Sequence, residues 1–191
     1  MVDLGLSVKW AKYNLGATGG SSAADWYGGY YAWGELASGK TDYIYTWNNY
    51  QYGNPPSKYN TTDHLTTLEA SDDAATVAYG HNFRMPTKTE LNELKGLTNE
   101  WVEDYQGING LNGRLFHGTG AYSANTLFIP AAGICYGGGR YFVGDYGYMW
   151  SASLVGDYVD VAWCLDFSDE GLYVENFFRY YGYSVRTVSS I

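Results

Sequence analysis

The stretch that decides the fold is Val161-Ala162-Trp163-Cys164-Leu165-Asp166-Phe167, a short, mostly apolar run with two aromatic residues. Similar short runs are Leu127-Phe128-Ile129-Pro130, Tyr148-Met149-Trp150-Ser151 and Tyr183-Ser184-Val185-Arg186-Thr187-Val188. Glycine-rich links such as Gly137-Gly138-Gly139 separate them. Aromatic runs divided by glycine links are typical of strands joined by turns. The region after about Trp101 is therefore predicted to form a twisted, irregular antiparallel sheet.

The N-terminal half has a different residue pattern, which predicts one strand and two helices. Apolar residues alternate with polar ones from Val2 to Gly16, which predicts a strand followed by a turn. A first helix is predicted over Leu65–Tyr79, with acidic residues near its start, where the helix dipole favours them. A second helix is predicted after Thr87, which with Glu90 forms a capping-box pattern.

The order of these elements predicts the fold class. A strand, two helices and then many strands indicate an α+β protein with two helices flanking the sheet. The 191 residues fit one domain, and no linker divides them, so 1–191 is predicted to be a single domain.

Composition excludes several classes of protein. The net charge is -9, and the 11 Lys and Arg residues are scattered, which disfavours nucleic acid and anionic membrane surfaces as partners. No apolar stretch approaches the length of a membrane span, so direct membrane insertion is not expected. The two cysteines, Cys135 and Cys164, are too few for a disulfide framework.

Several motifs together resemble a known family. They are Leu4-Gly5-Leu6-Ser7-Val8-Lys9-Trp10-Ala11, Tyr30-Tyr31-Ala32-Trp33-Gly34-Glu35, Asp72-Asp73-Ala74-Ala75, Phe83-Arg84-Met85-Pro86-Thr87, Phe128-Ile129-Pro130-Ala131-Ala132-Gly133, Trp150-Ser151-Ala152-Ser153 and Gly182-Tyr183-Ser184-Val185-Arg186. In this order they resemble the major paralogous domain of Bacteroidetes surface proteins. That domain is similar to the variable proteins of diversity-generating retroelements, in the formylglycine-generating-enzyme-like branch of the C-type lectin fold.

The resemblance implies a C-type lectin-like fold and a hypervariable C-terminal region, here residues 134–186. In such variable proteins, adenine mutagenesis turns Asn codons into NNC codons, which yield Tyr, Phe, Asp, Ser or Cys but never Trp, Lys or Glu. Trp150, Trp163 and Arg186 then correspond to fixed scaffold, whereas Glu170 and Glu175 cannot be NNC products. The candidate varied positions are Tyr141, Phe142, Asp145, Tyr146, Tyr148, Asp157, Tyr158, Asp160, Cys164, Asp166, Phe177, Phe178, Tyr180, Tyr181 and Tyr183.

These positions also form the candidate ligand-binding set, which Trp163, interleaved among them, completes. Tyr is rigid and carries both an apolar face and a hydroxyl, and it dominates antibody binding surfaces for that reason. In the run Phe177–Tyr183, successive side chains of a strand would point to opposite faces, so some rings must be exposed. The alternative is that the aromatic residues are core, which is the expectation for Trp33, Trp150 and Trp163.

Catalytic and metal-dependent functions have weaker support. Cys135 and Cys164 invite comparison with the thiol pair of formylglycine-generating oxidases, but no activating neighbour flanks either one in sequence. The Glu-Pro-Asn and Trp-Asn-Asp motifs of calcium-dependent lectins are absent. Asp157, Asp160, Asp166, Asp169 and Glu170 could supply oxygen ligands, but their spacing matches no known calcium loop.

We therefore expect no catalytic activity, cofactor or metal ion. The expected function is binding of a protein or glycan through the C-terminal region, on a cell surface or a phage particle, as the resemblance implies. An undiversified adhesive or structural domain is the main alternative, and a thiol oxidase is the second.

Overall fold

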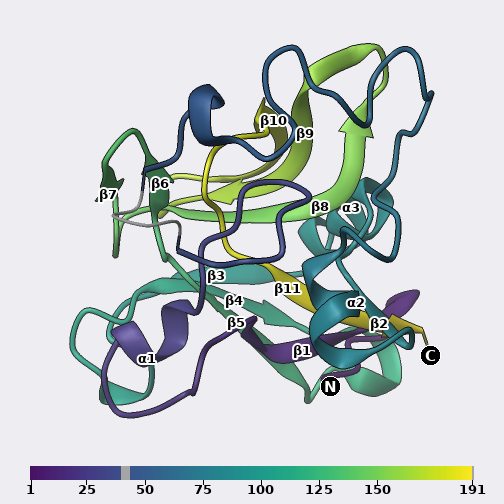
Figure 1. Cartoon of the computed structure of the whole chain (residues 1–191). Coiled ribbons are helices and arrows are strands. Elements are labelled where there is room, and N and C mark those ends of the chain that lie inside the picture. The colour runs from purple at the N-terminus through teal and green to yellow at the C-terminus, as the bar shows by residue number, and fades with distance from the viewer. Residues whose placement is uncertain (40–43, 191) are drawn as a thin grey trace.

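The computed structural model describes residues 1–39 and 44–190, which combine short helices with small antiparallel sheets (Figure 1). The strands are β1 (Val8–Asn14), β2 (Phe83–Arg84), β3 (Asn99–Val102), β4 (Gly113–His117), β5 (Thr126–Pro130), β6 (Ile134–Tyr136), β7 (Gly139–Tyr141), β8 (Gly147–Val155), β9 (Tyr158–Phe167), β10 (Leu172–Phe178) and β11 (Arg186–Ser190). The helices are α1 (Ala24–Tyr27), α2 (Ala74–Tyr79) and α3 (Lys88–Lys95), with 3-10 turns η2 (Trp47–Asn49), η3 (Tyr105–Gly107) and η4 (Gly120–Tyr122). The expected α+β class is confirmed.

The strands form separate small sheets, which corrects the prediction of one C-terminal sheet. The strand orders are β1-β11-β2, β3-β4-β5, β6-β7 and β8-β9-β10. The glycine links explain the division. Gly133 follows β5 with a φ of 71°, and a Cβ there would lie only 2.2 Å from the Tyr141 carbonyl oxygen. A sharp turn that only glycine tolerates therefore ends one sheet before the next begins.

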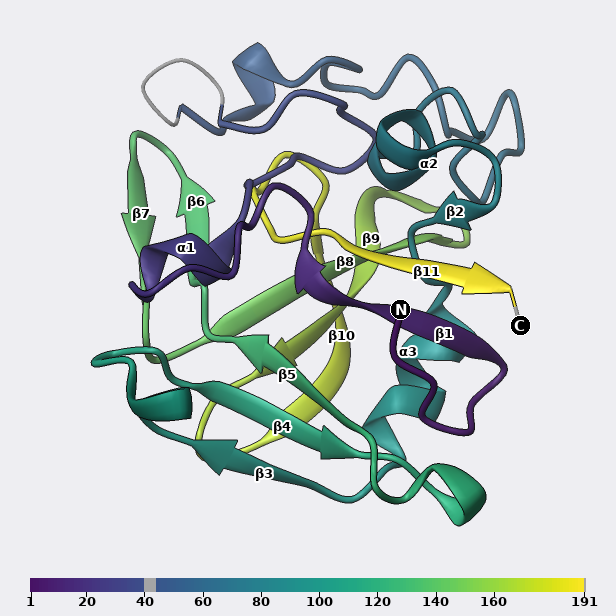
Figure 2. The same cartoon turned by 90° about the horizontal axis from the view of Figure 1, so that it is seen from below.

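The two ends of the chain meet in the β1-β11-β2 sheet. Figure 2 shows β1, β11 and β2 side by side, with both termini close to this sheet. Arg186 opens β11 and is fully buried. Its guanidinium donates hydrogen bonds to Asn14 Oδ1 at 2.9 Å and to the Phe128 carbonyl at 3.1 Å. The buried Arg186 thus joins β11 to β1 and β5.

The predicted N-terminal strand is shorter than expected. Regular pairing begins at Val8, because the chain first turns back through Gly5, where φ is 76°. Val2 and Trp10 exchange two backbone hydrogen bonds across this turn, at 2.6 and 2.9 Å. The alternation still has its predicted effect, since Leu4, Val8 and Trp10 are buried.

The second helix follows its capping box. The Thr87 Oγ1 atom accepts a hydrogen bond from the Glu90 amide at 3.3 Å, and Glu90 Oε2 accepts one from the Thr87 amide at 2.7 Å. Leu91 and Leu94 are fully buried on one side of α3. The capping box and the apolar spacing therefore predicted α3 correctly.

The first helix is much shorter than the predicted Leu65–Tyr79. It is α2, and its N-cap is Asp73, whose side chain accepts hydrogen bonds from the Ala75 and Thr76 amides. The preceding residues run extended beside β8: the Leu68 amide donates to the Ala152 carbonyl, and the Leu154 amide donates to the Thr66 carbonyl. Pairing with a neighbouring strand has replaced helix formation over this stretch.

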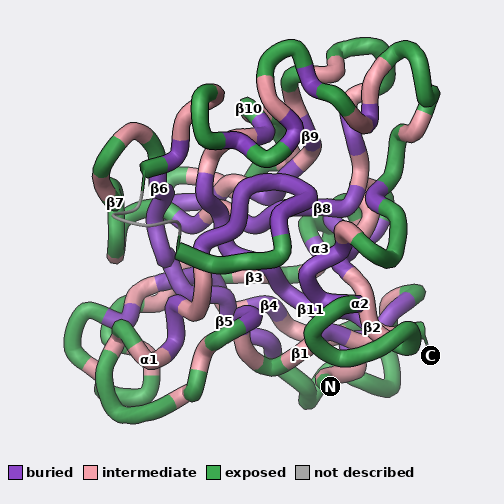
Figure 3. The backbone as a smooth tube through the Cα atoms, viewed as in Figure 1, coloured by how far each residue is buried: buried purple, intermediate pink, exposed green. Residues whose placement is uncertain are grey.

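The buried residues form two clusters, which run along the interior of the molecule (Figure 3). One cluster lies against α3 and contains Leu165 and Phe167 of β9. The other contains Ala162 and Cys164, at alternate positions of the same strand. Side chains of a strand alternate between faces, so β9 contributes to both clusters. The face of the β8-β9-β10 sheet that carries Cys164 leads to the candidate surface.

Candidate ligand-binding surface

Half of the sixteen predicted binding residues gather in one network of aromatic rings, called here the aromatic face. Every ring in it contacts at least one other, with centroids 4.4 to 6.4 Å apart, and every side chain is exposed or partly exposed. Such separations are typical of stabilising aromatic pairs. The aromatic face comprises Trp47, Tyr136, Tyr141, Phe142, Tyr146, Tyr148, Phe177, Phe178, Tyr180 and Tyr181.

One half of the aromatic face extends from the β6-β7 hairpin to β8. Tyr136 and Tyr141 are stacked at 4.4 Å across this hairpin. The network continues through Phe142 and Tyr146, whose centroids are 5.5 Å apart, to Tyr148 on β8. Phe142 has a φ of 60°, a left-handed conformation that a bulky side chain rarely adopts. The β7-β8 turn therefore holds an exposed ring in a strained backbone position.

The other half joins β10 to the segment that follows it. Phe177 meets Tyr148 edge to face at 5.9 Å. Phe178 and Tyr180 are stacked at 5.8 Å, and Trp47 lies 4.9 Å from Tyr180. Trp47 comes from η2, far away in sequence, and Figure 1 shows the chain around η2 beside β10. Three separate parts of the chain therefore build the aromatic face.

Tyr183 and Cys164 lie beneath this surface, which corrects their predicted exposure. Both are fully buried. The Tyr183 ring is stacked on Tyr148 at 4.8 Å and lies 4.3 Å from Trp150, so it supports the exposed rings from below. The expected core positions of Trp33 and Trp150 are confirmed.

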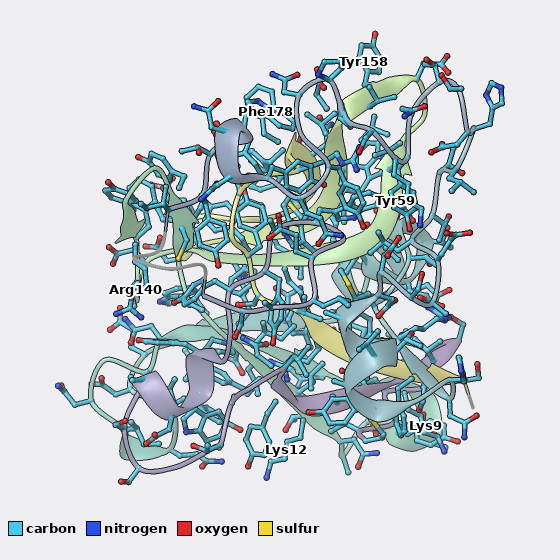
Figure 4. The ribbon with its side chains drawn as sticks, viewed as in Figure 1. Lys9, Lys12, Tyr59, Arg140, Tyr158 and Phe178 are labelled. Atoms are coloured by element: carbon cyan, nitrogen blue, oxygen red, sulfur yellow. The ribbon has the colours of Figure 1, made fainter. Side chains whose placement is uncertain are left out.

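Five other predicted residues lie apart from the ring network. Asp157, Tyr158 and Asp160 are exposed around the β8-β9 turn, and Tyr158 is the most exposed large apolar side chain among the described residues, at 75%. Figure 4 shows Tyr158 and Phe178 at different places along the same edge of the molecule. Asp145 is exposed in the β7-β8 turn. Trp163 is partly exposed, with Lys88 Nζ 3.3 Å from its ring centroid, so it is neither fully core nor part of the aromatic face.

A buried arginine supports the C-terminal half of the aromatic face. Arg179 is fully buried, and its side chain donates to Tyr50 Oη at 2.9 Å and to the carbonyls of Tyr59 and Val159 at 3.1 and 2.9 Å. Its guanidinium also lies 4.7 Å from the Trp33 ring centroid. Since Arg179 stands between Phe178 and Tyr180, these contacts fix the backbone from which both rings project.

The backbone after Tyr181 is paired on both sides. Gly182 exchanges two hydrogen bonds with Cys135, at 2.9 and 2.8 Å, and Tyr183 exchanges two with Tyr31, at 2.9 and 3.0 Å. The Ser184 amide donates to the Tyr148 carbonyl at 3.1 Å. Main-chain contacts therefore position this segment.

Asp166 lies within the same sheet face, between two tyrosines. The strand register places it opposite Tyr148 of β8 and opposite Tyr173 of β10. Glu175 is the next residue of β10 on that face and pairs with Cys164. Directly paired side chains point to the same side of a sheet. A half-buried carboxyl is thus bordered by two phenol rings and has a second carboxyl close by.

The ionisation of these groups reflects their surroundings. Burial first, and the charge of the nearby Glu175 carboxyl second, together raise the pKa of Asp166 to about 6. Burial, followed by the charge of Asp166, also raises the pKa of Tyr148. Burial and a side-chain hydrogen bond with Tyr180 raise the pKa of Tyr181 to about 12. The phenols therefore stay protonated near neutral pH, while Asp166 carries a negative charge in a poorly solvated place.

Both thiols lie in apolar surroundings. Burial raises the pKa of Cys135 to about 12, and it raises that of Cys164 well above its ordinary value. A reactive cysteine requires the opposite shift, because the thiolate is the nucleophile. Within residues 1–39 and 44–190, no three His, Cys, Asp or Glu side chains come together in a group that could hold a metal ion.

Sequence reasoning missed Tyr136, Trp47, Tyr173 and Glu175. Tyr173 and Glu175 could have been found by counting back in steps of two from Phe177, since alternate residues of a strand share a face. Tyr136 follows Cys135 just before the glycine run and could have been counted with the other tyrosines. Trp47 gives no local signal, because it reaches the aromatic face through the folding of a distant segment.

Comparison of the chain with family models, with curated proteins and with solved structures found no match. In the described part of the chain, no helix is long and apolar enough to cross a membrane. The resemblance to retroelement variable proteins therefore rests on the sequence motifs quoted above.

Proposed function

We propose that this chain is a non-catalytic binding domain that recognises a partner macromolecule through the aromatic face. The observation that carries the proposal is the ring network, in which ten aromatic side chains contact one another while each remains at least partly exposed. Monomeric proteins rarely expose contiguous apolar patches of this kind unless the patch binds something.

The size of the aromatic face favours a protein as the partner. One Tyr, Phe or Trp side chain can bury about 150–250 Å², whereas a standard protein interface buries about 800 Å² on each side. Ten partly exposed rings are in the range of such an interface. Tyr loses little rotamer entropy on binding and offers a hydroxyl, which suits it to contacts with another protein.

The resemblance supports a more specific form of the proposal, in which the fold is C-type lectin-like and the chain is a retroelement-diversified variable protein. Most members of the aromatic face are Tyr or Phe, which NNC codons encode, and Trp150, which they cannot encode, is fully buried. That division is the one expected between a varied surface and a fixed scaffold. Display on a cell surface or a phage particle follows from the same resemblance.

Two alternatives remain in view. An undiversified adhesive or structural domain would use the same aromatic face without hypervariability. A thiol oxidase has less support, because burial raises the pKa values of both cysteines. Sequencing of the source locus distinguishes an undiversified domain from a diversified one. Substitutions confined to adenine-derived positions within residues 134–186 support diversification. Uniform low variation along the chain contradicts it.

The binding proposal is tested with a double variant of the aromatic face, Tyr180→Ser with Tyr181→Ser. The wild-type chain is screened against arrays of surface proteins and glycans, and the affinity of any partner found is measured for each variant. Two hot-spot rings each contribute about 2 kcal/mol or more, so a loss of about 700-fold is expected if the two contributions add. The matched control is Tyr79→Ser with Tyr122→Ser, two exposed tyrosines outside the aromatic face. Equal affinities for both double variants would contradict the proposal.

A further inference from the structure

Asp166 and Glu175 lie beside aromatic rings without a cation to balance them. Asp166 is bordered by Tyr148 and Tyr173 in the strand register, and Glu175 lies diagonally next to it on β10. None of the ion pairs between described residues involves either carboxyl; the pairs join Lys9 to Asp3, Lys58 to Glu69 and Asp72, Arg84 to Glu90, and His117 to Glu100. This part of the surface therefore has an uncompensated negative charge among apolar rings.

The phenol of Tyr183 provides a second, independent observation. Its hydroxyl is buried and has no hydrogen-bond partner. Its ring is stacked at 4.8 Å on Tyr148, the residue that pairs with Asp166, so the phenol lies next to the same part of the sheet. Buried polar atoms are nearly always paired. The buried hydroxyl therefore leaves an unpaired polar atom beneath this part of the sheet, and it places no cation there to offset the Asp166 carboxyl.

The geometry points to a partner protein that presents a lysine or arginine side chain to Asp166 and Glu175, between the rings of Tyr148 and Tyr173. This inference rests on the proposed function, since it adds a charged centre to the aromatic face. The ammonium or guanidinium group donates hydrogen bonds to the carboxyls, and its methylene stem lies against the rings. Rings that flank a cation attract it through their negative faces, and the stem of a basic side chain packs on apolar surface.

The chemistry of the place favours a basic side chain over other cations. Two carboxyls are fewer than the six to eight oxygen ligands that calcium takes, and the neighbouring phenols are poor ligands while protonated. The net charge of -9 attracts a basic partner from a distance as well. A neutral sugar would stack on the rings but leave the charge of Asp166 unbalanced.

The experiment titrates the isotope-labelled chain with N-acetyl-lysine methylamide and, separately, with N-acetyl-norleucine methylamide, a neutral probe of similar shape. Binding is followed by NMR chemical-shift changes at low salt. The cationic probe is expected to bind at least about fivefold more tightly, which corresponds to about 1 kcal/mol. Its largest shifts are expected at Asp166, Glu175 and Tyr173. The preference should fall as salt is added.

Two conservative variants test which carboxyls cause the preference for the cationic probe. Asp166→Asn and Glu175→Gln are each expected to reduce the preference for the cationic probe to about twofold or less, whereas Asp157→Asn, an exposed acid outside the ring network, should leave it unchanged. Equal affinities for the two probes, or shifts centred on the β8-β9 turn, overturn the inference. Binding of the neutral probe to the aromatic face, with no preference for the cation, would overturn it while leaving the proposed function intact.

Discussion

Replacing Asp166 with asparagine should stabilise the protein at neutral pH. The folded chain raises the pKa of this carboxyl from 3.8 to about 6, because of burial first and the nearby Glu175 second. A group whose folded pKa lies above its unfolded value holds more protons in the folded state between those two values. The stability contributed at this position is therefore lost as the pH rises from about 4 to about 6, and it stays lost at pH 7.

The size of the effect follows from the two pKa values. They differ by about 2 pH units, and each unit corresponds to 1.36 kcal/mol, which sets an upper bound of about 3 kcal/mol. Asp166 is only half-buried, so solvent screening reduces the expected gain to about 1 to 2 kcal/mol for Asp166→Asn at pH 7. At pH 4 the wild-type carboxyl is already largely protonated in the folded state, and the two proteins should be nearly equal.

Urea denaturation followed by tryptophan fluorescence measures this difference at pH 4, 5, 6 and 7. Only the difference between the variant and the wild type is used, because other carboxyls change stability over the same range. Asp157→Asn serves as the control for removing one negative charge from the chain. A variant that is less stable than the wild type at pH 7, or equally more stable at pH 4 and pH 7, would refute the reasoning.

Three further changes test the structural account of the aromatic face. Phe142→Asn should raise the free energy of unfolding by about 0.5 to 1 kcal/mol, since asparagine tolerates the left-handed backbone there; a loss of stability in urea would contradict this. Tyr183→Ala should cost about 3 kcal/mol or more, because its ring is fully buried; a drop in urea midpoint no larger than for Tyr180→Ala would show that it is not core. Arg179→Met should cost about 3 kcal/mol by calorimetry, because several buried acceptors lose their donor, and near-wild-type stability would mean that they find other partners.

The sequence predicted correctly those elements that depend on residues close together in the chain. The capping box of Thr87 and Glu90 placed α3 correctly, because both of its hydrogen bonds join residues three apart. The first helix was predicted too long for the opposite reason. Leu68 and its neighbours pair with β8, which is distant in sequence, and no local pattern reveals that pairing. The division into small sheets likewise depends on tight turns such as Gly133.

The sequence predicted which residue types form the candidate site, but it did not predict which of those residues the fold would bury. The alternation of strand residues showed that some rings must be exposed, yet it could not show which ones the fold would cover. Tyr183 was expected at the surface because it ends the aromatic run Phe177–Tyr183, but its backbone pairs with Tyr31 and its ring is enclosed by Tyr148 and Trp150. Trp47 joins the aromatic face only through the path of the folded chain.

The paired backbone of Gly182, Tyr183 and Ser184 has a consequence for how this protein can evolve. Amide and carbonyl groups hold the segment, and every residue type except proline supplies both. The rings before it at positions 180 and 181 can therefore be exchanged for other side chains at little risk to folding, while the neighbouring Arg179 and Arg186 keep the frame in place. Proline at 183 or 184 would remove a paired amide, and a side chain at 182 would come within 2.7 Å of the Tyr45 ring. Under the proposed function, the rings that contact a partner are separate from the residues that hold the fold, so new specificities could arise without first requiring a more stable ancestor.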